Sequence, residues 1–292
     1  MDDLQIRSPA KINLFLEVVD RRPDGYHEIE TVMQLVDLCD EVHLHRMRRG
    51  IQVSVAGADL PIGRENLAYQ AAALLQERTG LREGVHIHLE KHIPVAGGLG
   101  GGSSNAAAVL AGLTRLYGLG ETRETLQKLA AQLGSDIPFF LTDGLALATG
   151  RGERLATLRP WPPFWVVLAN PGVAISTAWA YREASSKLTA WQGRASIQAL
   201  IANDRIAWPP VWAFNRLEAV VLPQHPEVSA LKSLLQEGGG SPVLMSGSGA
   251  SVFAVVPDGR SAEALATRIR AGGQFAAAVT TLPANPIQAA LA

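Results

Sequence analysis

Twelve consecutive residues, 94–105, have the composition of a loop that binds phosphate groups. Five of them are glycine, and they lie between an alternating apolar segment, 85–91, and an alanine-rich segment, 106–116. Glycine lets the backbone approach a ligand closely and point successive N–H groups at it. A helix that begins at Ser103 would add unpaired N–H groups and the positive end of its dipole. The pattern therefore predicts a site for a phosphate chain.

The spacing in this glycine loop excludes two common phosphate-binding motifs. A Walker loop ends in Gly-Lys-Ser/Thr, whereas Gly102 is followed by Ser103 and Ser104 with no lysine. The dinucleotide fingerprint G-x-G-x-x-G also fails, because Ser103 stands where the third glycine belongs. Glycine-rich turns also serve purely structural purposes. From the loop alone, a nucleoside triphosphate site and an ordinary turn both stay open.

Two charged residues are candidates for chemistry at such a site. Asp136 can accept a proton from a hydroxyl group, but it can equally cap a short helix that continues through Pro138. Lys11 lies among alternating apolar residues, 10–16, although a lysine beside a strand is usually solvated. The residues alone leave both alternatives open for Asp136.

Composition limits the class of protein. With 292 residues, of which 47% are hydrophobic and 18% charged, we expect two globular domains, 1–158 and 159–292, divided near a Pro/Trp-rich stretch at 159–165. The net charge of -1 indicates no basic surface for nucleic acid. No apolar run is long enough to span a bilayer and the chain opens with acidic residues, so we expect a cytoplasmic protein without a membrane partner. A single cysteine, Cys39, excludes an internal disulfide.

Strand and helix patterns mix along the chain without strict β-α-β alternation, which favours an α+β fold. Period-two alternation and short apolar runs predict strands at 12–18, 41–45, 51–56, 85–91, 145–149, 166–169, 252–256 and 275–280. Helical patterns and capping residues predict helices at 66–79, 103–117, 122–133, 197–203, 215–221, 227–236 and 261–271.

Three separated segments resemble the signature motifs of the GHMP kinases. They are PAKINLFL at 9–16, the glycine loop, and SGSGASVFA at 246–254. The resemblance implies a nucleotide-binding N-terminal domain like domain 2 of ribosomal protein S5 and a ferredoxin-like C-terminal domain. It also implies that the substrates lie in the cleft between the two domains.

Blocks at 24–31, 133–140 and 170–177 resemble a particular branch of that family. The branch uses ATP with Mg²⁺ to phosphorylate the 2-hydroxyl of a small molecule, 4-diphosphocytidyl-2-C-methyl-D-erythritol, in isoprenoid precursor biosynthesis. The alternative is a GHMP kinase of the homoserine or mevalonate type. By analogy with the family we expect a monomer or a weak homodimer.

The resemblance assigns roles to particular positions. It implies that Asp136 is the catalytic base and that Lys11 holds it ionised. ATP would contact Asn66 and the loop residues Pro94, Val95, Ala96, Gly97, Gly98, Leu99, Gly100, Gly101, Gly102, Ser103 and Ser104, although helix capping explains Asn66 equally well. The cytidyl substrate would contact Asn13, Tyr26, His27, Thr177, Tyr181, Gly247, Ser248 and Gly249.

The other histidines are not expected to bind metal. His43 and His45, like His86 and His88, are spaced as residues on one face of a strand, and no acidic partners are evident from the sequence. A zinc site requires several converging ligands. We therefore predict no dedicated metal site, and expect Mg²⁺ to arrive with the phosphates.

Overall fold

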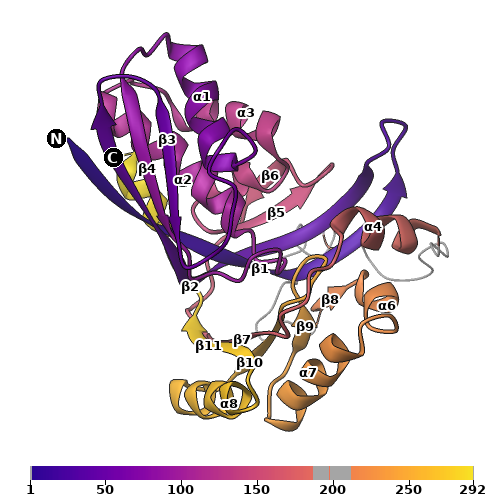
Figure 1. Cartoon of the computed structure of the whole chain (residues 1–292). Helices are drawn as coiled ribbons and strands as arrows, with labels where there is room; N and C mark the ends of the chain where they lie inside the picture. The colour runs from indigo at the N-terminus through magenta and orange to yellow at the C-terminus, as the bar shows by residue number, and fades with distance from the viewer. Residues whose placement is uncertain (1, 187–196, 198–211, 292) are drawn as a thin grey trace.

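The computed structural model describes residues 2–186, 197 and 212–291. A long, curved β-hairpin runs through the middle of the molecule (Figure 1). Its strands are β1 (Asp3–Arg21) and β2 (His27–Met47), which pair antiparallel from one end to the other. The expected strands at 12–18 and 41–45 are therefore parts of much longer strands.

The hairpin forms the centre of the first sheet, whose order is β3-β4-β2-β1-β8, with β5 pairing to β2 and β6 to β5. Among the described strands of this sheet, β3 with β4 and β8 with β1 pair in parallel, and the other pairs are antiparallel. The other strands of this sheet are β3 (Ile51–Ala56), β4 (Gly84–Glu90), β5 (Leu145–Thr149), β6 (Arg154–Thr157) and β8 (Phe214–Asn215).

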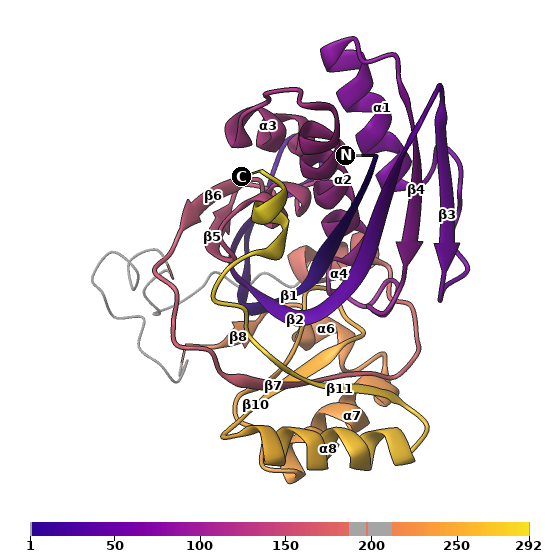
Figure 2. The same ribbon diagram turned by 90° about the vertical axis from the view of Figure 1, so that its left-hand side faces the viewer.

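Three helices, α1 (Leu67–Thr79), α2 (Gly101–Tyr117) and α3 (Arg123–Leu133), cover one face of this sheet (Figure 2). The alanine-rich sequence of α2 explains its central position, because small side chains let the helix approach the strands. A Cβ added at Gly112 would lie 2.4 Å from Leu44 Cδ1. The short 3-10 helix η1 (Ile137–Leu141) contributes Phe139 and Phe140 to the same core.

The second half contains a four-stranded antiparallel sheet with the order β11-β7-β10-β9. Helices α7 and α8 pack on its outer face, at the bottom of Figure 1, and α4 and α6 complete that core. The strands are β7 (Trp165–Asn170), β9 (Val243–Met245), β10 (Val252–Val256) and β11 (Phe275–Thr280), and the helices are α4 (Thr177–Ser186), α6 (Glu218–Val221), α7 (Pro226–Glu237) and α8 (Gly259–Ala271).

The inner face of the second sheet packs against the middle of β1, so the two halves share a hydrophobic core. Two segments of the second half also return to the first. Strand β8 joins the first sheet, and the final helix η2 (Pro286–Ala290) packs beneath α2 with Ile287 fully buried. A boundary after residue 158 stays a prediction. No helix in the described part of the chain combines the length and apolar composition that crossing a bilayer requires.

The α+β prediction is confirmed, with one expected helix assigned incorrectly. The helix predicted at 215–221 is shorter, because the Asn215 side chain donates to the carbonyls of Met245 and Gly247 and its backbone pairs with β1. The helix predicted at 197–203 lies outside the described residues except for Ile197, which is buried.

Candidate active site

A cavity of about 780 Å³ opens between the hairpin, the glycine loop and the second half of the chain. Most of the sequence-predicted site residues line it, although they come from segments far apart in the chain. They are Lys11, Asn13, Tyr26, His27, Ala96, Gly98, Gly100, Ser103, Asp136, Thr177, Tyr181, Gly247 and Ser248. One continuous space therefore joins the predicted phosphate, catalytic and substrate positions.

Lys11 and Asp136 meet at the floor of this cavity. The ammonium Nζ of Lys11 lies 3.7 Å from Asp136 Oδ2 and donates a 2.5 Å hydrogen bond to Asn13 Oδ1. Burial lowers the pKa of Lys11, and the nearby Asp136 carboxylate opposes that shift. A buried ammonium thus has a carboxylate as its ionic partner, as a charge at that depth requires.

The Asp136 carboxylate is not used as a helix cap. Asp136 precedes η1, but its side chain makes no capping hydrogen bond to that helix, every residue of which is described. Its side chain is 42% exposed and faces the cavity. The carboxylate is consequently available to a ligand, which favours the catalytic alternative over the structural one.

Helix α2 begins at Gly101, two residues before the predicted start at Ser103. Serine is a good N-cap, but here the cap is Gly100, in the left-handed conformation at φ 73° with no side-chain capping bond. A Cβ at Gly100 would lie 2.7 Å from the Phe140 ring. The first N–H groups of α2 therefore lack a side-chain cap, and the Ser103 hydroxyl lines the cavity.

Both halves of the chain hold the glycine loop in place. The Leu99 carbonyl accepts from Lys11 N at 2.9 Å, and the Gly97 carbonyl accepts from Ser251 N at 3.1 Å. Gly98 has a φ of 75°, and a Cβ there would lie 2.1 Å from the Ser246 carbonyl. Only glycine fits at this contact, so the SGSG segment and the loop are shaped to each other.

A buried ionic network beneath the loop was not anticipated from the sequence. Asp40 and Lys91 are ion-paired with almost no exposure of either side chain. Asp40 also accepts from the backbone N–H groups of His92 and Ile93, at 2.8 and 2.9 Å, and from Asn105 Nδ2 at 3.0 Å. Lys91 additionally donates to Asn105 Oδ1 at 2.8 Å. The network ties β2, the end of β4 and the first turns of α2 together.

The rings of His27 and Tyr181, which line the same cavity, stack with centroids 5.6 Å apart and an interplanar angle of 28°. Burial lowers the pKa of His27, and the Arg21 guanidinium lowers it further. Burial raises the pKa of Tyr181 well above its usual range. His27 Nε2 is buried and has no hydrogen-bond partner among the described residues. A neutral imidazole thus presents an unused polar atom.

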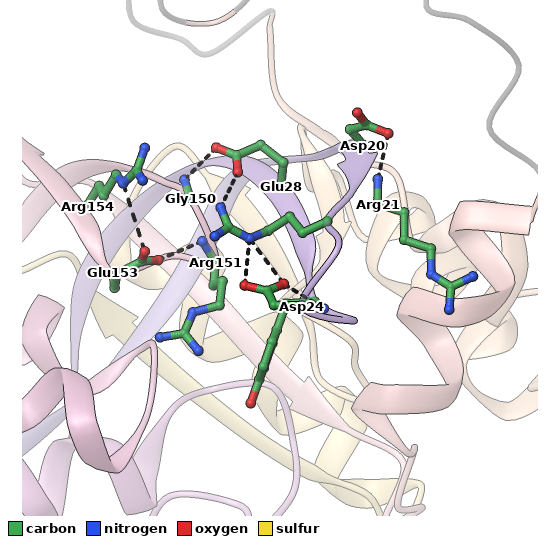
Figure 3. Close-up of polar contacts among 10 residues, drawn as sticks. Asp20, Arg21, Asp24, Glu28, Gly150, Arg151, Glu153 and Arg154 are labelled. Atoms are coloured by element: carbon green, nitrogen blue, oxygen red, sulfur yellow. Dashed lines mark hydrogen bonds and ion pairs between the residues drawn. The ribbon is translucent and has the colours of Figure 1, made fainter.

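The hairpin tip is fixed by a charged network (Figure 3). Arg22 donates to Asp24 at 3.2 Å and to Glu28 at 2.7 Å, while Glu28 accepts from Gly150 N at 3.1 Å. These contacts place the Arg151 guanidinium 4.7 Å from the centre of the Tyr26 ring.

The three arginines that line the cavity were missed by the sequence analysis. Only the Gly-Arg-Gly sequence around one of them indicated an unusual turn. They are Arg21, Arg151 and Arg182.

The other sequence-predicted positions lie outside this cavity. Pro94 and Val95 line a second cavity, of about 420 Å³, on another side of the loop. The Asn66 side chain caps α1, accepting from Ala68 N at 2.9 Å and donating to the Pro61 carbonyl. The remaining positions line neither cavity: Gly97, Leu99 and Gly249 lie in loops, and Gly101, Gly102 and Ser104 lie in the first turn of α2.

One expectation about the strand histidines is wrong. His43 lies 3.4 Å from a Glu90 carboxylate oxygen and 3.7 Å from one of Glu41, and His45 lies 2.7 Å from Asp3. Glu90 and Asp3 come from the strands on either side of β2, and Glu41 precedes His43 by two residues on the same face of β2. The sequence does not show such pairs until strand register is known.

Comparison with known proteins places this geometry in a family. The chain matches the family model of the GHMP kinases N terminal domain over residues 66–144 and that of the GHMP kinases C terminal over residues 195–274. It is 45% identical over 254 residues to a 4-diphosphocytidyl-2-C-methyl-D-erythritol kinase of Shouchella clausii, covering 86% of this chain and 85% of the relative.

Solved structures support the same family assignment. A crystal structure of 4-(cytidine 5'-diphospho)-2C-methyl-D-erythritol kinase superposes with a TM-score of 0.80 and 37% identity, covering 95% of this chain and 99% of the other. A homoserine kinase from Cytophaga hutchinsonii shares the fold, with a TM-score of 0.70 and 20% identity over 97% of this chain and 95% of the other. The chain therefore belongs to the GHMP kinases, and within them to the group of the 4-diphosphocytidyl-2-C-methyl-D-erythritol kinases.

Proposed function

We propose that this protein transfers the γ-phosphoryl group of ATP to the 2-hydroxyl of 4-diphosphocytidyl-2-C-methyl-D-erythritol, a step in isoprenoid precursor biosynthesis. The observation that carries the proposal is that one cavity holds two groups of side chains. The Lys11–Asp136 pair and the His27–Tyr181 stack both line it, together with residues of the glycine loop. A homoserine or mevalonate kinase would have no use for the aromatic stack, so the alternative is not favoured.

Asp136 is proposed as the base of this reaction. The acceptor hydroxyl oxygen forms a bond to the γ-phosphorus, the bond from phosphorus to the bridging β,γ-oxygen breaks, and the hydroxyl proton passes to the Asp136 carboxylate. Lys11 favours the ionised form of that carboxylate and offsets the negative charge that builds up during transfer. The N–H groups of the glycine loop and the start of α2 bind the ATP phosphates.

His27 and Tyr181 are proposed to recognise the cytosine end of the substrate. Cytosine has a flat face and a polar edge, which suit an aromatic stack beside an unused imidazole nitrogen. Tyr26, at the cavity mouth, supplies a second ring. Asn13 and Thr177 are proposed to contact the polar groups of the erythritol and the diphosphate, with Gly247, Ser248 and Gly249 closing that side.

Mg²⁺ fits the donors at the phosphate end of the cavity. Ser103 lines the cavity beside the glycine loop, and its hydroxyl is a hard oxygen donor of the kind Mg²⁺ accepts. Few protein ligands are needed, because the nucleotide phosphates and water complete the coordination. When bound, the ion neutralises charge on the transferring phosphoryl group.

The experiment that tests this function is a competition for labelled phosphate. The protein is incubated with γ-labelled ATP, Mg²⁺ and equal concentrations of the cytidyl substrate, homoserine and mevalonate. We expect label in the cytidyl product only. Preferential labelling of homoserine or mevalonate would refute the proposed substrate.

Replacing His27 with alanine is expected to raise KM for the cytidyl substrate by about tenfold to a hundredfold, since a buried hydrogen bond to the base is lost. The KM for ATP should change little, because His27 is not part of the glycine loop that is proposed to bind the phosphates. Steady-state kinetics with each substrate varied in turn will separate the two constants. The half-buried His225→Ala, outside the active-site cavity, is the matched control.

The same residue predicts a pH dependence. Because the pKa of His27 is lowered, the ring takes up its proton only at a pH below the ordinary imidazole value of about 6.5. The wild-type KM for the cytidyl substrate should therefore stay flat as pH falls to that value and rise only below it. The rise should be absent in His27→Ala. A KM that climbs already above pH 7 in the wild type would show that another group controls binding.

A further inference from the structure

A group of metal-ligating side chains lies on the first sheet, outside the lining of the active-site cavity. Strands β2 and β4 pair antiparallel, which puts His43 opposite His88 and Glu41 opposite Glu90. The alternate residues of these strands, such as Val42 and Leu44, are buried under the helices. The polar residues therefore face away from the helices. We call the following four residues the Glu–His cluster: Glu41, His43, His88 and Glu90.

The distances in the Glu–His cluster suit a shared cation better than a shared proton. His43 Nε2 lies 3.4 Å from Glu90 Oε1 and 3.7 Å from Glu41 Oε2, and His88 Nε2 lies 3.8 Å from Glu90 Oε1. Charge-assisted hydrogen bonds would be shorter, about 2.7–2.9 Å. Ligand bonds of about 2.0–2.2 Å in a tetrahedral site put neighbouring donor atoms about 3.3–3.6 Å apart. The distance from His43 to Glu90 falls in this range, and the other two lie just beyond it.

One ring nitrogen of His43, in the Glu–His cluster, lacks a hydrogen-bond partner among the described residues. This atom, Nε2, is buried. Leaving such an atom unsatisfied is costly, and native proteins rarely do so. A cation held between His43 and the two carboxylates would satisfy it. One donor atom from each of Glu41, His43 and Glu90 already lies within 4.8 Å of the others.

Ser54, on the neighbouring strand β3, orients the second histidine. Its hydroxyl lies 2.8 Å from His88 Nδ1 and 2.8 Å from His86 Nε2. A hydroxyl has one proton, so it donates to one ring and accepts from the other. When it accepts from His88 Nδ1, the lone pair of His88 is on Nε2, the atom on the side of Glu90. This is the outer support that metal-binding histidines generally have.

We propose that the Glu–His cluster binds one divalent transition-metal ion of the zinc class, which cross-links β2 to β4. His43, Glu41 and Glu90 supply three donor atoms that already lie close together, and His88, next to Glu90, would approach as the fourth ligand. A set that includes imidazole nitrogen suits zinc rather than Mg²⁺ or Ca²⁺, which take oxygen ligands. None of the four residues lines the cavity that holds Lys11 and Asp136. The ion would therefore stabilise the sheet without entering the reaction.

The test is titration of the full-length chain, with no affinity tag and stripped with a chelator, by ZnCl₂ at pH 7.5 in a calorimeter. We expect one ion per chain, a higher melting temperature with zinc, and a tetrahedral visible spectrum when Co²⁺ replaces zinc. His43→Gln should weaken binding by about tenfold or more, and Ser54→Ala by about tenfold. His45→Gln, two residues along the same face, is the matched control and should bind as the wild type does.

Kinase activity distinguishes loss of the site from loss of the fold. His43→Gln should keep wild-type turnover with Mg-ATP, since it lies outside the active-site cavity. If that variant does not fold, Glu90→Gln takes its place in the titration. Absence of zinc binding by the wild type, or equal affinity in wild type and His43→Gln, would overturn the proposal. A cluster that responds only to pH, with no metal bound, would overturn it as well.

Discussion

Asp136→Asn is expected to lower kcat by about a thousandfold, which corresponds to about 4 kcal/mol of transition-state stabilisation. The amide keeps the shape of the carboxylate but cannot accept the hydroxyl proton. The KM for ATP should stay within about threefold, because the phosphates are bound by the backbone of the glycine loop. Steady-state and single-turnover kinetics with the cytidyl substrate will measure both constants.

Asp143→Asn is the matched control for this substitution. Asp143 lies just beyond the other end of η1, pairs with Arg123 at 3.0 Å, and is exposed. Its loss should leave kcat within about twofold of the wild type, since an exposed ion pair contributes little. If Asp136→Asn retains more than about a tenth of wild-type kcat, Asp136 is not the catalytic base.

The pH profile of the same variant provides an independent check. Turnover requires charged Lys11, so kcat should fall as pH rises through the pKa of this group. Burial lowers that pKa and Asp136 raises it. Removing the carboxylate charge therefore lowers the pKa of Lys11 further, and the alkaline limb of the residual activity should move to lower pH. An unchanged alkaline limb would show that Lys11 and Asp136 are not coupled.

Local sequence patterns predicted the parts of the site that one segment builds alone. The glycine loop, the helix after it and most strands follow from residues close together in the chain. The start of α2 was misplaced because propensity favours serine as a cap, whereas Gly100 and Phe140 are in contact through the tertiary fold. At this position tertiary packing outweighs the capping propensity of serine. The family resemblance, rather than the residues themselves, decided between the two roles of Asp136.

Pairs that join distant segments could not be predicted in the same way. Asp40 and Lys91 are 51 positions apart, and each reads in sequence as an ordinary charge at a strand end. His43 meets Glu90 only because β2 and β4 pair in one particular register, and a shift of one residue would turn those side chains to the opposite face. Such contacts depend on strand register and on the order of strands in the sheet, which a single sequence does not supply.

The Asp40–Lys91 pair leads to the second large expected effect. Asp40→Ala should lower the free energy of unfolding by about 3–5 kcal/mol, because it leaves the Lys91 ammonium buried and without its counter-charge. The backbone N–H groups of His92 and Ile93 lose their acceptor at the same time. Urea unfolding followed by circular dichroism will report the change as a lower midpoint. Asp37→Ala, an exposed ion-paired residue on the same strand, should cost no more than about 1 kcal/mol.

A double-mutant cycle shows whether the cost comes from an unpaired charge. Lys91→Met alone should also destabilise the protein, since it leaves the buried Asp40 carboxylate without its counter-charge. Asp40→Ala combined with Lys91→Met removes both charges. The double variant should therefore be more stable than the sum of the two single losses predicts. Strictly additive losses would mean that the two groups act independently, with Asp40 serving only as an acceptor for backbone N–H groups. Because the same network holds the first turns of α2, any surviving Asp40→Ala protein should also show a raised KM for ATP, while Asp37→Ala should not.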